Sequence, residues 1–214
     1  MLWTWFRRLV MIGIPLILVW LEWDHPSGFS KNVYEGLSPL DDWWMWLHIF
    51  QSFLFGGMAV AAVLLTLNIN DFWGIASKLA AWLFAVCYLV FDSTAGISVG
   101  LMIVTIQQDP SMDLPTMQKM LQAAYLNPIV GGSGSFFSMT GSWAWLVAVA
   151  TAIVAIFLHS KEIPLWKRLP PLVLLAVSGY VLYVGHYSPY GPIAFSCFAA
   201  ASIWFEMFRF GPAQ

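Results

Sequence analysis

Five ionisable side chains interrupt long apolar runs in this 214-residue chain: Glu22, His25, His48, Asp92 and His186. Imidazole nitrogens and carboxylate oxygens are the protein ligands of zinc, iron and manganese. The same groups serve as general acids and bases. We therefore take all five as candidate metal ligands, and Asp92 and Glu22 also as candidate catalytic groups.

The composition places these residues in a membrane protein. Hydrophobic residues make up 60% of the chain and charged residues 9%, whereas a soluble domain has roughly 25% charged residues. Because the chain is so apolar, most of its surface must contact lipid and not water. The fold class expected is an all-α polytopic helix bundle. The net charge of −2 says nothing about nucleic acid, but the sequence has no basic domain, so we expect no nucleic-acid partner.

Six apolar segments are long enough to span a bilayer. A short amphipathic segment, in which apolar residues recur with helical spacing, is expected at about 114–126 outside the membrane. We predict one integral membrane domain, 1–214, with spans at about 2–23, 43–67, 79–106, 139–158, 170–185 and 191–208.

Basic residues predict the orientation of these spans. With the N-terminus in the cytoplasm, an even number of spans returns the C-terminus to the cytoplasm. Only Lys31 and Lys119 then lie outside, which agrees with the positive-inside rule. The seven basic residues placed inside are Arg7, Arg8, Lys78, Lys161, Lys167, Arg168 and Arg209. We expect a multi-pass protein of the bacterial plasma (inner) membrane.

Counting along the helices gives the depth of the ionisable residues. Glu22 follows Arg8, and Asp92 follows Lys78, by about 14 residues, or about 21 Å of helix. Both then lie roughly 9 Å inside the outer face of a hydrocarbon core about 30 Å thick. His48 reaches a similar depth counted inward from the outer loop. His25 and His186 are expected nearer the outer surface.

Ionisable groups at this depth cost free energy unless they are paired or hydrated, so they are expected to face the interior of the bundle. Glu22 and His25 have the Glu-x-x-His spacing of helical di-iron sites. Pro26 disfavours a helix at His25, and no second such pair occurs. A single metal ion is therefore the simpler expectation, with Gln51 as an outer-sphere group one turn from His48.

Each residue also has a purely structural interpretation. Asp92 could form a hydrogen bond to a neighbouring helix, and Glu22 and His48 could lie at the membrane interface. His25 and His186 could be ordinary loop residues. The Gly96–Gly100 pair has the GxxxG spacing that allows close approach of another helix.

Four short segments resemble a family of uncharacterised bacterial membrane proteins. They are residues 22–29 (EWDHPSGF), 47–48 (LH), 91–96 (FDSTAG) and 186–191 (HYSPYG). The resemblance implies a polytopic fold in the bacterial inner membrane and brings no activity with it.

Four functions follow from these patterns. The first is an outward-facing metal site, holding zinc, iron or manganese, in an enzyme that hydrolyses a lipid-like substrate. The second is a proton- or cation-coupled transporter or channel using Glu22, His48 and Asp92. The third is a haem b electron carrier with His48 and His186 as axial ligands. The fourth is a structural or accessory subunit.

Overall fold

The computed structural model describes residues 1–26, 32–40 and 42–208, and in them the chain is all-helical. Six of its helices are long and apolar enough to cross a membrane, which confirms the number of spans expected and makes the chain a polytopic membrane protein. These candidate spans are Leu2–Leu21, Trp43–Leu65, Phe72–Gln108, Phe136–His159, Leu165–Val184 and Tyr190–Phe208. The side of the membrane on which the termini lie stays a prediction.

The first span contains a π-helical segment next to its proline. It consists of α1 (Leu2–Arg8), the π-helical turn Leu9–Gly13 and α2 (Ile14–Leu21). Pro15 has no N–H, and its ring clashes with the carbonyl four residues before it in a regular α-helix. A wider π-turn at that point removes the clash, so the helix continues past the proline.

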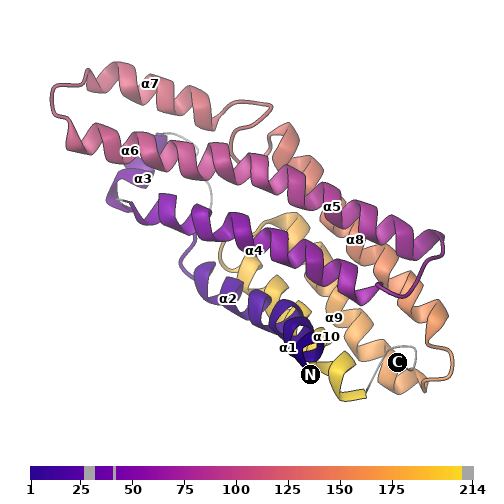
Figure 1. The fold of residues 1–214 in the computed structure, drawn as a ribbon. Helices are drawn as coiled ribbons and strands as arrows, with labels where there is room; N and C mark the ends of the chain where they lie inside the picture. The colour runs from indigo at the N-terminus through magenta and orange to yellow at the C-terminus, as the bar shows by residue number, and fades with distance from the viewer. Residues whose placement is uncertain (27–31, 41, 209–214) are drawn as a thin grey trace. The chain divides into compact units, whose positions relative to one another are not determined.

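The chain divides into two compact units. Unit 1 comprises Met1–Pro26, Gly56–Ala85 and Ser142–Gln214. In it α10 (Tyr190–Phe208) packs along α9 (Leu165–Val184) and α2, as Figure 1 shows. Its core includes the buried Trp145 of α8 (Phe136–His159), whose ring lies 4.9 Å from the Phe84 ring and 5.8 Å from the Phe198 ring, centre to centre.

The α9 helix begins before its two prolines, Pro170 and Pro171, not after them as the sequence led us to expect. A proline at position 171 leaves the carbonyl of Lys167 without its helical N–H donor. The indole Nε1 of Trp204, on α10, donates to that carbonyl at 2.9 Å. Packing between α9 and α10 thus compensates for a bond that the proline removes.

The third span is one long helical run, with α5 (Phe72–Phe91), a π-helical segment (Asp92–Ser98) and α6 (Val99–Gln108). It starts about seven residues before the expected position, because the Asp71 side chain caps the first turn by accepting the Gly74 N–H at 2.9 Å. Its 37 residues correspond to about 55 Å of helix, more than the hydrocarbon core of a bilayer.

Unit 2 comprises Ser27–Phe55 and Val86–Gly141. The expected amphipathic segment is the helix α7 (Leu114–Tyr125), which packs on α6 and on the short helix α3 (Val33–Leu37) (Figure 1). Leu121 and Tyr125 are its buried residues. The Gln122 side chain also accepts a hydrogen bond from the backbone N–H of Val33 at 3.1 Å.

The Gly96–Gly100 pair lies against the first turns of α4 (Trp43–Leu65), as the GxxxG spacing predicted. A Cβ atom added at Gly100 would fall 2.7 Å from the Met45 Cβ, and one added at Gly96 would overlap the His48 ring. The Trp44 indole also donates to the carbonyl of Ala95 at 3.3 Å. Unit 2 therefore holds His48 directly against the π-helical segment of the third span.

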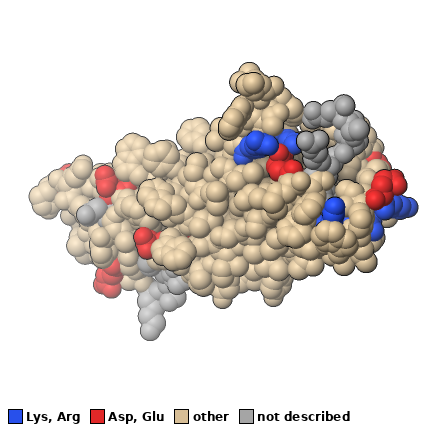
Figure 2. Space-filling model, turned by 90° about the horizontal axis from the view of Figure 1, so that it is seen from below, with Lys and Arg blue, Asp and Glu red and all other residues tan. Residues whose placement is uncertain are grey.

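The visible surface agrees with a lipid environment. Figure 2 shows a face on which most residues are neither basic nor acidic. Exposed tryptophans lie near the ends of the candidate spans, where their amphipathic rings favour the membrane–water interface. They include Trp3, Trp5, Trp20, Trp23, Trp46 and Trp166.

Candidate functional site

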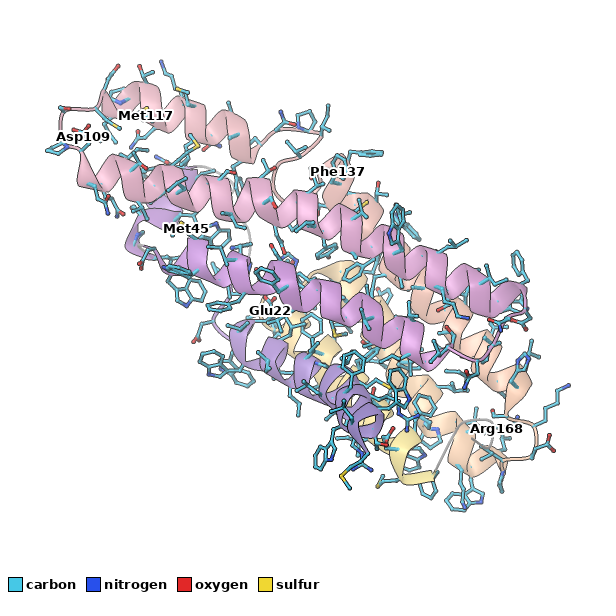
Figure 3. All side chains as sticks on the ribbon, in the orientation of Figure 1. Glu22, Met45, Asp109, Met117, Phe137 and Arg168 are labelled. Carbon is cyan, nitrogen blue, oxygen red and sulfur yellow. The ribbon has the colours of Figure 1, made fainter. Side chains whose placement is uncertain are left out.

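The first part of the candidate site is the turn that follows α2. Glu22, labelled in Figure 3, comes directly after the helix and is fully buried. The backbone N–H of His25 donates to the Glu22 carbonyl at 3.2 Å, so the Glu-x-x-His pair lies in a turn and not on a regular helix. Asp24, which points out of this turn, is exposed.

The His25 ring has a defined tautomer. Its Nδ1 lies 2.9 Å from the carbonyl oxygen of Pro26. Because a carbonyl only accepts, Nδ1 carries the proton and Nε2 carries the lone pair. Burial lowers the pKa of His25 from 6.5 to about 4, against the opposing effect of the Pro26 carbonyl. The ring is therefore neutral at pH 7, which is the form that binds metal ions.

The loop between α9 and α10 brings His186 to His25. The Ser188 N–H donates to the His25 carbonyl at 3.1 Å, and the two imidazole rings lie edge to face with their centres 4.9 Å apart. Gly191 permits this fold of the loop, since a Cβ there would overlap the His186 carbonyl and lie 3.1 Å from the Glu22 Cβ. Unit 1 thus gathers Glu22, His25 and His186, all buried.

In unit 2, His48 lies on the second turn of α4. The residue is 2% exposed, and its Nδ1 lies 2.8 Å from the carbonyl oxygen of Trp44. By the same reasoning as for His25, Nδ1 carries the proton and Nε2 is the acceptor nitrogen. The ring is held between the Trp44 indole, 4.3 Å away centre to centre, and the backbone at Gly96. Gln51, less than one turn further along α4, is also buried.

Asp92 is the first residue of the π-helical segment and lies about one turn from Gly96. It is fully buried, and neither carboxyl oxygen has a hydrogen-bond partner among the residues that the structure describes. Burying such a group without a partner is costly. Short π-helical segments inside α-helices occur frequently at functional sites.

The structure thus buries all five candidate residues, although the sequence placed His25 and His186 nearer the surface. The α9–α10 loop explains the difference, because it folds back on the turn after α2. His25, His48 and His186 form a group of buried histidines that could hold a metal ion. Whether Glu22 or Asp92 acts as a ligand or catalytic group stays a prediction.

Several contributors to the site carry no chemical signal in the sequence. The Trp44 carbonyl fixes the His48 tautomer, the Ser188 N–H anchors the loop, and Gly191 leaves room for the His186 carbonyl. A backbone group exists at every position, so its role depends on tertiary structure. Only the spacing of Gly96 and Gly100 indicated a close contact in advance.

Comparisons with known proteins add no identity to this description. No family model, curated protein or solved structure matches the chain.

Proposed function

We propose that His25, His48 and His186 together bind one transition-metal ion in a polytopic membrane protein. The observation that carries the proposal is the state of the buried imidazoles. In His25 and His48 the Nδ1–H donates to a backbone carbonyl, which places the lone pair that can bind a metal ion on Nε2. Metal-binding histidines are commonly oriented by such an outer bond.

The adjacent imidazoles of His25 and His186 support the same proposal. Two rings 4.9 Å apart, centre to centre, can direct nitrogens at a common ion, and burial keeps His25 neutral. Three histidines with a fourth position open to water form a known type of catalytic zinc site. Iron and manganese are the other metals that such ligands accept.

We further propose that the site is catalytic and faces the outer leaflet of a bacterial inner membrane. A metal ion supplies an activated water at neutral pH. Glu22 or Asp92, each a buried carboxyl group, would accept the proton of that water while it attacks a lipid-like substrate. The distribution of basic residues supports this orientation.

Elemental analysis of the full chain tests the proposal. The protein is purified in mild detergent without chelator and without a histidine tag, and its metal content is measured. We expect near-stoichiometric zinc, iron or manganese, and loss of that metal in His48→Ala. His159→Ala is the matched control, because His159 makes the same type of Nδ1 bond but is half exposed.

Two results would overturn the assignment. One is full metal occupancy in His48→Ala, and the other is no metal after reconstitution with each ion. An absorption spectrum of the same sample separates a haem protein, which has a Soret band, from a simple metal site.

A proton or cation relay is the second candidate function, and Asp92 favours it. A fully buried carboxyl group without a hydrogen-bond partner among the described residues is typical of proton pathways in membranes. This alternative predicts pH-dependent flux in proteoliposomes that Asp92→Asn abolishes, with no stoichiometric metal. A metal-loaded protein without flux would exclude it.

A further inference from the structure

A cavity lies in unit 1 among the ends of four candidate spans. Arg7 and Met11 come from the first half of the first span, and the remaining wall comes from the last turns of α4, α8 and α10. The full lining is Arg7, Met11, Leu64, Leu65, Ile156, Phe205 and Glu206. Five of these seven side chains are apolar, and the two charged ones belong to one ion-pair network.

Arginine outnumbers carboxylate in this network. Glu206 accepts from the guanidinium of Arg7 and, at 3.2 Å, from the Nε of Arg8. The Glu206 side chain is 14% exposed, whereas Arg7 and Arg8 are 33% and 51% exposed. One positive charge therefore remains in excess, on side chains that a ligand can reach.

Arg7 also has unused donor capacity. Its Nε is buried and has no hydrogen-bond partner within the described residues. A guanidinium carries five N–H donors, more than one carboxylate can satisfy. A buried donor of this kind is costly unless an acceptor is supplied, and a ligand oxygen can supply it.

We propose that this cavity binds an anionic phospholipid. The phosphate would contact Arg7 and Arg8, and an acyl chain would lie against Met11, Leu65 and Phe205. Guanidinium groups match the geometry of phosphate oxygens, and basic pockets between membrane helices bind anionic head groups.

The apolar walls favour a lipid over a free anion. Met11, Leu64, Leu65, Ile156 and Phe205 offer no donor to an inorganic ion, but they can bury methylene groups. The position also fits, because Arg7 and Arg8 lie near the beginning of a candidate span, where lipid head groups are found. This site is separate in sequence and chemistry from the buried histidines.

Thermal unfolding of delipidated protein in mixed micelles tests the proposal. Phosphatidylglycerol is titrated against phosphatidylcholine of the same acyl chains, with inorganic phosphate as a third probe. We expect phosphatidylglycerol to raise the Tm and the other two to have little effect. Arg8→Gln should lower the apparent affinity for phosphatidylglycerol about tenfold, as expected for the loss of one charge-assisted hydrogen bond.

Two further variants make the test specific. Leu65→Trp fills the cavity and should reduce binding without changing any charge. Lys161→Gln removes an exposed charge outside the cavity lining and should leave the lipid effect intact. Equal shifts with both lipids, or an undiminished effect in Arg8→Gln, would overturn the proposal. A full effect from inorganic phosphate alone would assign the site to a free anion instead.

Discussion

Unit 1 holds ionisable side chains in two very different settings. In the first, Arg7 and Arg8 pair with Glu206, and His159 lies 3.8 Å from Asp71. These groups keep contact with solvent and have a charged partner nearby. In the second, Glu22, His25 and His186 are at most 8% exposed, and two of the three are histidines. The first arrangement is ordinary for helix ends in a membrane, and the second is not.

The two settings differ in which cations the sequence provides. Neither lysine nor arginine occurs between Arg8 and Lys31, or between Arg168 and Arg209. The segments that carry Glu22 and His186 therefore contribute no permanently positive side chain of their own. The ion pairs at Glu206, in contrast, use two arginines of the first span. Burial of ionisable groups is thus the better guide to function here, and their presence alone is a poor one.

The largest effect should come from Gly191→Ala, in the buried setting. The added Cβ would overlap the His186 carbonyl, which is backbone and cannot rotate away. Displacing the loop should cost about 3 kcal/mol and should also release bound metal. Thermal unfolding and metal content check this result. Gly56→Ala is the control and should change the Tm little, because nothing lies within 4 Å of its added Cβ. If Gly191→Ala also had only a small effect, the α9–α10 loop would not be what holds the site together.

A pH titration of metal-free protein should give the next largest effect. The pKa of His25 is 6.5 when unfolded and about 4 when folded, so the unfolded chain gains a proton first as the pH falls. The free energy of unfolding should therefore be constant above about pH 6.5, fall by about 3 kcal/mol between pH 6.5 and pH 4, and then level off.

Chemical denaturation in detergent at a series of pH values measures this loss. The variant His25→Gln should show a clearly flatter profile in the same range, because it removes the titrating group. An unchanged profile in that variant would mean that His25 is protonated normally and is not buried in solution.

A smaller effect is expected from Trp204→Phe, on α10. The substitution removes the donor to the Lys167 carbonyl, which Pro171 leaves without its helical partner. The net cost of one such hydrogen bond is about 1 kcal/mol. Thermal unfolding should show a modest decrease in Tm, and Trp82→Phe, at an exposed position, should show none. Equal decreases would indicate that ring size, and not the hydrogen bond, decides the outcome.

The smallest effect should come from His159→Gln. Its side chain is 49% exposed, and its contact with Asp71 is long. Exposed ion pairs of this kind contribute about 0–1 kcal/mol and weaken with salt. We expect a change in unfolding free energy below about 0.5 kcal/mol at low salt. A loss comparable with that of Gly191→Ala would remove the distinction between the two settings.

Local signals explain why the helices could be predicted. Apolar length alone locates the six spans, and apolar residues at helical spacing locate α7. The start of α9 could not be predicted in this way, because prolines normally end or precede a helix. The compensating donor, Trp204, is 37 positions away in the sequence. No local rule connects the two residues.

The candidate site was predictable in its residues but not in its geometry. Helix depth indicated that Glu22, His48 and Asp92 would be buried, and the structure buries all three. The same reasoning placed His186 nearer the surface, since it treats a loop as a simple exit from the membrane. Burial of His186 depends on the Ser188 hydrogen bond and on Gly191, which are features of loop conformation. The π-helical segment at Asp92 likewise had no sequence signal.

The bond from Trp204 to the Lys167 carbonyl also bears on how the protein is made. During synthesis α9 emerges first, and its donor exists only after most of α10 has been translated. Until then the carbonyl must stay in contact with water, since an unmet backbone acceptor is costly in lipid. Of the six candidate spans, α9 and α10 are also the two least hydrophobic. The two helices are therefore best suited to enter the bilayer together, as a hairpin.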